Sequence, residues 1–370
     1  MAVTVLERRS MLTSDSRAAT FHPATLDLLA ELGIADALIA DGTLVDRLQW
    51  RTRRGRVLAE MHMNLLAGRT AHPYRLHAEQ NALIALLAAE LACCPRAQLR
   101  VATAVDAVTD TGSRVKVRTG AGWEVADYVV AADGAHSTVR SVLGLPFAAT
   151  PYPTRAVRIF TDSPLADLLP GLAPLTYVRD PAGSCSLLQM PDHWRIIVRL
   201  PPGADANPHS DEVAALARRA VPVRGQQVAI TAADTYRLAR GVLESFRYGR
   251  VLFIGDAAHV TSTAGGLNMN AGIAEAVALG GVLAAVLGDA APVAALDGWA
   301  DRSRRILLEA VIPRSEARVD GVQDGDQVRL RAAVARLRAT AADPATARAF
   351  LAKASLLDIL SQPTPSRSRS

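Results

Sequence analysis

The sequence predicts an α/β protein in which a β-rich segment interrupts a layered domain of strands and helices. Two short apolar runs, residues 128–132 and 251–254, each end at an acidic residue and lead into the start of a helix. Strand-like runs separated by Pro- and Gly-rich turns fill residues 147–236, and a mostly helical pattern follows residue 299. With 370 residues, half of them hydrophobic, the chain can build two joined domains.

The first half of the chain alternates between strands and helices. A β-branched run at residues 3–6 predicts the first strand, and an apolar helix closed by Gly33 follows from Pro23. The further predicted elements are strands at 44–50 and 57–63, a helix at 80–92, and strands at 101–108, 114–118 and 128–132.

The second half begins with alternating strands and ends in helices. The predicted strands are 154–160, 175–179, 184–190, 194–200 and 251–254, and the predicted helices are 211–220 and 271–287. Helices are also expected between residues 299 and 360. The Ser-, Pro- and Arg-rich end, 361–370, has the composition of a disordered tail.

Residues 249–272 carry the strongest functional signal. The strand at 251–254 ends at Gly255-Asp256, and a loop containing Gly265-Gly266 opens into the apolar helix that follows. The unpaired N–H groups at a helix start attract an electron-rich ligand, and a carboxylate stands beside them. The pattern therefore predicts a ligand cradle, although an ordinary strand–loop–helix connection would also explain it.

This segment resembles the second flavin-binding motif of the class A flavoprotein aromatic hydroxylases, the para-hydroxybenzoate hydroxylase family. The resemblance implies that Asp256, after Gly255, accepts a hydrogen bond from a ribityl hydroxyl of FAD. It also implies that the next helix start faces the pyrimidine end of the isoalloxazine; the residues concerned are Gly265, Gly266, Leu267, Asn268, Met269 and Asn270.

Further segments resemble the same family in the same order along the chain. Asp133-Gly134 resembles the family's other short motif, which lies near the flavin and near the path of the nicotinamide. The alternative is an ordinary Asp-Gly turn in which Ser137 caps the following helix. The resemblance implies that Glu7, which ends the first strand, holds the adenosine ribose. It also implies that Arg17 contacts the adenosine side and Gln80 the pyrophosphate; both could instead be surface residues.

One expected element of a dinucleotide fold has no counterpart in the sequence. Such a fold opens with a strand, a Gly-x-Gly-x-x-Gly turn and a helix, whereas this sequence starts at what resembles the second strand. We therefore expect a Rossmann-like FAD-binding domain that lacks its first strand–helix unit, about 30 residues. A late start site and a true truncation remain alternatives, and both predict weak flavin binding by the chain as written.

The resemblance also divides the chain into segments by role. The FAD-binding domain is expected in two pieces, and a β-sheet that binds substrate lies between them. The predicted segments are 1–146 (first piece of the FAD-binding domain), 147–240 (substrate-binding sheet), 241–298 (second piece of the FAD-binding domain), 299–360 (C-terminal helices) and 361–370 (tail).

Composition excludes several classes of protein. The net charge of +5 is spread along the chain, and its densest cluster, residues 51–56, is predicted to be a solvated hairpin tip. Aromatic residues make up only 4%, so a nucleic-acid stacking platform is not expected. The adjacent Cys93 and Cys94 are predicted to be buried packing residues, and no metal spacing is present. We expect a cytoplasmic protein without a membrane span, because the helix 271–287 is short and contains Glu275.

The function implied by the resemblance is hydroxylation of an aromatic or polyketide-like small molecule, with NADPH or NADH as electron donor and O2 as oxidant, through a flavin C4a-hydroperoxide. No catalytic residue is assigned, and His259 is expected to anchor its loop. A monomer or homodimer is expected. The alternatives are a non-redox ligand-binding or interaction protein, or a flavin reductase or halogenase. The only two lysines, Lys116 and Lys353, lie outside any motif, which argues against a halogenase.

Two positions depart from the family pattern. Where the family has one or two prolines after the histidine, this chain has Ser262-Thr263. Where the family commonly has a glycine before Met-Asn, this chain has Asn268. These polar side chains either replace rigid turns or add contacts to a substrate, and the sequence leaves both possibilities open.

Overall fold

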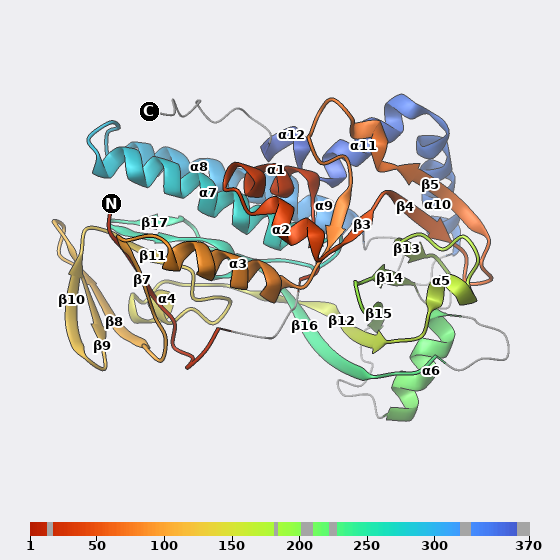
Figure 1. Ribbon diagram of the computed structural model, residues 1–370, viewed down its shortest axis with the longest axis horizontal. Helices are drawn as coiled ribbons and strands as arrows, with labels where there is room; N and C mark the ends of the chain where they lie inside the picture. The colour runs from red at the N-terminus through yellow and green to blue at the C-terminus, as the bar shows by residue number, and fades with distance from the viewer. Residues whose placement is uncertain (13–17, 181–183, 201–209, 222–227, 319–326, 361–370) are drawn as a thin grey trace. The chain divides into compact units, whose positions relative to one another are not determined.

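The computed structural model describes residues 1–12, 18–180, 184–200, 210–221, 228–318 and 327–360 (Figure 1). Arg17 and the predicted disordered tail, 361–370, lie outside the described residues. The chain forms two compact units, each built from three segments. Unit 1 contains residues 1–19, 79–152 and 238–316, and unit 2 contains 20–78, 153–237 and 317–370.

Unit 1 combines parallel strands with helices and a small antiparallel sheet. Strand β1 pairs in parallel with β7, β11 pairs in parallel with β18, and β8, β9 and β10 form the antiparallel sheet. Its strands are β1 (Val3–Leu6), β7 (Ala97–Arg100), β8 (Val105–Asp110), β9 (Val115–Thr119), β10 (Gly122–Ala126), β11 (Val129–Ala131), β17 (Arg247–Tyr248), β18 (Val251–Phe253) and β19 (His259–Val260). Its helices are α3 (Gln80–Ala92), α4 (Thr138–Val142), η2 (Gly255–Ala257), α7 (Leu267–Leu287), α8 (Ala295–Ile306), η3 (Leu307–Val311) and α9 (Ile312–Ala317), the last ending at the unit boundary.

Unit 2 is organised around a large, mostly antiparallel sheet with the strand order β16-β12-β15-β14-β13-β4-β5, and a second sheet has the order β2-β6-β3. Its strands are β2 (Thr20–Phe21), β3 (Thr43–Val45), β4 (Arg47–Arg51), β5 (Val57–His62), β6 (Arg75–His77), β12 (Thr150–Thr161), β13 (Leu175–Val178), β14 (Cys185–Gln189), β15 (Trp194–Leu200) and β16 (Ala232–Val242). The first residues of β12, 150–152, and the last residues of β16, 238–242, are counted with unit 1. Its helices are α1 (Pro23–Glu31), α2 (Ala35–Ala40), η1 (Met63–Leu66), α5 (Leu165–Leu168), α6 (Ser210–Ala220), α10 (Gln327–Ala342), α11 (Pro344–Ala354) and α12 (Leu357–Leu360).

The predicted α/β class is confirmed, and most predicted elements are present. The bounds of α3 and β15 match the predicted ranges, and the strand expected at 101–108 begins later, at Val105. By contacts, residues 20–78 belong with the large sheet of unit 2. The predicted segments concern which stretches of the chain hold cofactor and substrate, and they stay predictions.

Strands β1 and β11 of unit 1 are among those that are paired along one edge only, within the residues that the structure describes. Strand β1 has β7 as its partner and β11 has β18. Val3 and Val5 point to the same face of β1 and are 38% and 39% exposed, and Val130 of β11 is 38% exposed.

Helix α7 is longer than the sequence predicts, because it begins at Leu267 and not at Ala271. The prediction that this helix is too short to span a membrane is therefore wrong. Among the described helices, α7 is the one long and apolar enough by length and composition to cross a membrane. The core helix of a soluble protein passes the same test, and the buried Glu275, paired with His259, favours that interpretation.

Two predictions about which residues are buried are wrong. Cys93 and Cys94 are exposed, because the end of the apolar helix α3 is uncovered and Leu83 is its only buried residue. Arg51, predicted to be in a solvated hairpin tip, is only 6% exposed and donates from Nη2 to the carbonyl of Pro170 at 2.7 Å. Burial lowers the pKa of its guanidinium, whereas Arg54 and Arg56 at the hairpin tip are exposed as predicted.

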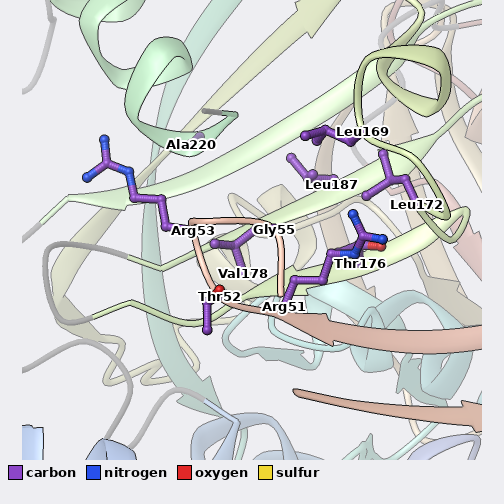
Figure 2. Close-up of a pocket in the computed structure, with 10 residues that line it drawn as sticks. All are labelled: Arg51, Thr52, Arg53, Gly55, Leu169, Leu172, Thr176, Val178, Leu187 and Ala220. Atoms are coloured by element: carbon purple, nitrogen blue, oxygen red, sulfur yellow. The ribbon is translucent and has the colours of Figure 1, made fainter. Parts of the chain in front are cut away.

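A small pocket in unit 2 lies beside this hairpin (Figure 2). It contains about 260 Å³ of space between its atoms, some of which is open to solvent. Figure 2 shows that the guanidinium of Arg53 points away from the other lining residues. The lining residues are Arg51, Thr52, Arg53, Gly55, Leu169, Leu172, Thr176, Val178, Leu187 and Ala220, and none of them is a predicted site residue.

Candidate functional site

Two motifs from distant regions of the sequence meet where β11 and β18 end. The strands pair in parallel with Ala131 opposite Phe253, and the N–H of Ile254 donates to the carbonyl of Ala131 at 3.1 Å. Asp133 lies two residues after Ala131, and Gly255 lies two residues after Phe253. Because parallel strands end at the same edge of a sheet, both acidic motifs are brought to one place.

Arg140 binds the two motifs to each other. Its Nη1 donates to the carbonyl of Ala257 at 2.8 Å, and its Nη2 donates to the carbonyl of Ala135 at 2.6 Å. The guanidinium also stacks on the ring of Phe147, 3.8 Å from the ring centroid. Burial lowers the pKa of Arg140, while the nearby carboxylate of Asp133 opposes this shift. One side chain therefore connects the two loops that follow the paired strands.

The Asp133-Gly134 segment is also held by local hydrogen bonds. Ser137 caps α4, since its Oγ accepts from the N–H of Arg140 at 3.0 Å. Asp133 Oδ2 accepts from the N–H of Val139 at 3.0 Å. The alternative in which Ser137 is a helix cap is therefore correct for Ser137, and it does not conflict with the position of Asp133 at the strand end.

The start of α7 lies next to Asp256. Gly265 and Gly266 have φ angles of 84° and 66°, which residues with a side chain rarely adopt. Gly266 is the N-cap of α7, and no side chain caps this end of the helix. Asn268 Nδ2 donates to Asp256 Oδ1 at 2.8 Å, and Asn270 Nδ2 donates to the carbonyl of Gly266 at 2.6 Å. The helix N-terminus and the carboxylate thus form one cradle.

A buried histidine forms hydrogen bonds with residues of this cradle. The ring of His259 is fully buried, and its Nδ1 lies 3.0 Å from Asn268 Oδ1. Its Nε2 lies 2.9 Å and 3.0 Å from the two carboxylate oxygens of Glu275. Burial alone lowers the pKa of His259, but Glu275, Asp256 and Asn268 outweigh it, so the pKa is raised. His259 therefore anchors its loop, as predicted.

The remaining predicted residues lie elsewhere in unit 1. The backbone of Glu7 continues the pairing of β1 with β7, and its Oε1 accepts from the N–H of Arg9 at 2.8 Å. Gln80 is the first residue of α3, and its Oε1 accepts from the N–H of Ala18 at 3.4 Å. Gln80 therefore lies beside Ala18, while Arg17 lies outside the described residues. Leu267 is buried and Met269 partly buried in the first turn of α7.

Sequence reasoning underestimated two residues, Arg140 and Glu275. Glu275 accepts from the N–H of Gly255 at 3.1 Å in addition to His259. The available signal was a single acidic residue within an otherwise apolar helix, because such a residue is buried only when it is paired. For Arg140, the signal was an arginine in the first turn after a capping serine. No group of residues suited to a metal ion occurs in the region of the chain that the structure describes.

These features define a class of protein. Acidic residues at the ends of adjacent parallel strands, a turn of two left-handed glycines and an uncapped helix start are the components of a dinucleotide-binding site. The donors also fit a flavin: Asp256 offers carboxylate oxygens to a sugar-like hydroxyl chain, and the start of α7 offers N–H groups to the carbonyl-rich end of the ring.

Comparison with known proteins identifies the family. The model of the FAD binding domain family matches residues 1–314, and the chain belongs to this family. It is 27% identical over 367 residues to para-nitrophenol 4-monooxygenase of Pseudomonas sp. (strain WBC-3), covering 94% of this chain and 88% of that protein. It is 30% identical over 322 residues to 6-hydroxy-3-succinoylpyridine 3-monooxygenase of Pseudomonas putida, covering 85% and 81%.

A solved structure extends the likeness to the fold. The crystal structure of p-nitrophenol 4-monooxygenase from Pseudomonas putida DLL-E4 matches with a TM-score of 0.88 at 25% identity, covering 96% of this chain and 92% of that one. The chain is therefore an FAD-dependent monooxygenase of the class A type, and FAD is its cofactor. These findings favour the monooxygenase over the alternatives of a reductase, a halogenase or a non-redox protein.

Proposed function

We propose that this chain hydroxylates a phenol-like aromatic compound with one ring, using NADPH or NADH, and that it holds FAD between the ends of β11 and β18 and the start of α7. The observation that carries the proposal is the hydrogen bond of 2.8 Å between Asn268 and Asp256, because it joins the acidic strand end to the helix start. The parallel register of β11 and β18 adds Asp133 to the same place.

Each residue of the cradle has a distinct role in this proposal. Asp256 accepts a hydrogen bond from a ribityl hydroxyl, and Gly255 lets the chain turn beneath it with a φ of 55°. Leu267, Asn268 and Met269 carry backbone N–H groups that face the pyrimidine end of the ring, where electron density is high. Asp133 and Gly134 lie where the nicotinamide approaches.

Further residues serve the adenosine end of the cofactor. Glu7 holds the ribose, Gln80 contacts the pyrophosphate, and Arg17 contacts the adenosine side. When bound, FAD takes a hydride from the nicotinamide and then activates O2, chemistry that no protein side chain supplies. The work of the protein is to orient the ring and to keep water from it, so the site needs no metal or triad of catalytic side chains.

The names of the two relatives described above support the substrate class. One is a monooxygenase for para-nitrophenol and the other for a hydroxylated pyridine, and both names describe a single aromatic ring bearing hydroxyl or nitro groups. Both relatives are covered over more than four fifths of their length, so the likeness is not restricted to the cofactor domain. We therefore favour a single-ring phenol over a polyketide-like substrate of several rings.

The cofactor side of the proposal is tested with Asp256→Ala. Removing a charged acceptor from a hydrogen bond costs about 1–3 kcal/mol, which corresponds to FAD binding roughly 5- to 150-fold weaker. The measurement is titration of the chain with FAD, followed by flavin fluorescence. Asp301→Ala, at an exposed position of α8, is the matched control and leaves the affinity unchanged. Equal affinity for both variants would remove Asp256 from the site.

The substrate side is tested by the rate of NADPH or NADH oxidation by the FAD-loaded protein. Single-ring phenols, including para-nitrophenol, are expected to accelerate oxidation. A phenol attacked at a ring carbon that bears hydrogen is expected to be recovered with one added oxygen, as mass spectrometry can show. A panel of multi-ring phenols serves as the comparison. Acceleration by the multi-ring compounds alone would refute the proposed substrate class and leave the cofactor site untouched.

A further inference from the structure

Asn268 occupies the position where the family commonly has glycine, and its side chain forms hydrogen bonds with two groups of the cradle. Its Nδ2 lies 2.8 Å from Asp256 Oδ1, and its Oδ1 lies 3.0 Å from His259 Nδ1. Both contacts stay within the loop and the helix start. This chain's departure from the family pattern therefore belongs to the cradle itself.

The chemistry of the donors and acceptors determines which atoms of Asn268 and His259 carry hydrogen. An ionised carboxylate can only accept, so Asn268 directs its NH2 group at Asp256 and its carbonyl oxygen at His259. That carbonyl oxygen can only accept, so Nδ1 of His259 carries a proton. Glu275 also accepts, from Nε2 at 2.9 Å. With Glu275 ionised, both ring nitrogens of His259 donate and the ring is an imidazolium.

The charge is buried and balanced. The side chain of His259 is 0% exposed and that of Glu275 is 7% exposed. The charged groups that face the imidazolium are Glu275, on α7, and Asp256, on η2, while the ring of Phe246 stacks on its other side at 5.8 Å. A buried ion pair persists only when its hydrogen bonds are complete, and here every ring N–H has an acceptor.

The link closes into a ring of contacts. Glu275 Oε2 accepts from the N–H of Gly255 at 3.1 Å, and Gly255 is the residue before Asp256. The circuit therefore runs from Asp256 through Asn268, His259 and Glu275 to Gly255 and back along the chain. Asn268 holds the carboxylate of Asp256, and Glu275 holds the backbone just before it, so the carboxylate loses little freedom when a ligand binds to it.

We propose that Asn268 couples the carboxylate of Asp256 to a buried imidazolium, so that His259 and Glu275 are positioning residues for the flavin. This inference rests on the proposed role of Asp256. It departs from the family pattern, because a glycine at position 268 has no side chain with which to make the link. A carboxylate oxygen has more than one lone pair, so the contact with Asn268 leaves capacity for a ribityl hydroxyl.

The first test needs no flavin. In the flavin-free chain, nitrogen NMR of labelled histidine at pH 7.5 is expected to show both ring nitrogens of His259 protonated, with the signal assigned by its loss in His259→Asn. Glu275→Gln is expected to make the ring neutral at this pH, and Glu90→Gln, an exposed residue of α3, is expected to have no effect. A neutral ring in the parent chain would overturn the proposal.

The second test measures FAD affinity. Asn268→Gly installs the family's residue and is expected to weaken FAD binding about 5- to 10-fold, the effect of one lost hydrogen bond. Asn64→Gly, at an exposed position in unit 2, is the matched control. Affinity that is equal or higher in Asn268→Gly would overturn the proposal, because Asn268 would then compete for Asp256.

A pH profile separates positioning from simple structural support. In Glu275→Gln, FAD affinity is expected to fall between pH 6 and pH 8.5, as His259 loses its proton, while the parent shows no such fall. A uniform loss at both pH values would indicate a structural role and overturn the proposal. Failure of the parent to bind FAD would refute the proposed function and the positioning role together, while the NMR result would still decide the charge of His259.

Discussion

His77 makes the stability of unit 2 sensitive to acid. Its ring is fully buried, Nδ1 donates to the carbonyl of Gln189 at 2.8 Å, and Nε2 has no hydrogen-bond partner among the residues that the structure describes. Burial, together with the positive charges of Arg75 and Arg195, lowers the pKa of His77 from 6.5 to about 4. Below pH 6.5, the unfolded chain therefore takes up a proton at this residue and the folded chain does not.

The sign and the size of the effect follow from this difference. The free energy of unfolding has its full value above pH 6.5 and falls as the pH approaches 4. For a shift from 6.5 to about 4, the loss is about 2 kcal/mol at pH 5 and about 3 kcal/mol at pH 4. Asn at position 77 keeps a donor for Gln189 and does not titrate.

The assay is urea unfolding of the parent chain and of His77→Asn at pH 8 and pH 5, followed by tryptophan fluorescence. The parent is expected to lose about 2 kcal/mol more than the variant between the two pH values. Any packing defect of the variant is present at both pH values and cancels. His136→Asn, at an exposed position, is the control and should follow the parent. Equal losses in the parent and in His77→Asn would refute the reasoning.

Two further predictions concern thiols and glycines. Native protein should react with a thiol reagent at Cys93 and Cys94, because both are exposed. Burial raises the pKa of Cys185 to about 12, so this thiol should react only after denaturation. Fast reaction of all three thiols in the native state would contradict this. Gly241→Ala should destabilise unit 1 by about 1–3 kcal/mol, because an added Cβ would lie 2.9 Å from the ring of Phe147 and 3.1 Å from backbone. Gly280→Ala, exposed on α7 with nothing nearby, should stabilise by up to about 1 kcal/mol, and thermal melting compares the two.

Sequence reasoning succeeded where the signal is local. A β-branched or apolar run ending at an acidic residue predicts a strand end, and the positions of Asp133 and Asp256 after β11 and β18 agree with this. The bounds of α3 also follow from local signals, a polar first residue and a run of strong helix formers.

What the sequence could not supply depends on contacts between distant residues. Helix α3 is apolar on every side, so its pattern does not reveal that Cys93 at its end is uncovered. The burial of Arg51 depends on the carbonyl of Pro170, which lies 119 residues away. The contact from Asn268 to His259 depends on the angle at which α7 starts, and a two-glycine turn sets that angle.

The open strand edges in unit 1 have a consequence for the protein in solution. A strand with one unpaired edge presents free N–H and C=O groups in register, and the exposed valines of β1 add apolar surface beside them. Two molecules can pair along such edges without unfolding, and the pairing grows with concentration. Self-association of the 370-residue chain is therefore expected at high concentration even when the fold is intact. A lysine at position 3 or 5 would suppress it, while the proposed flavin cradle at the ends of β11 and β18 would be unchanged.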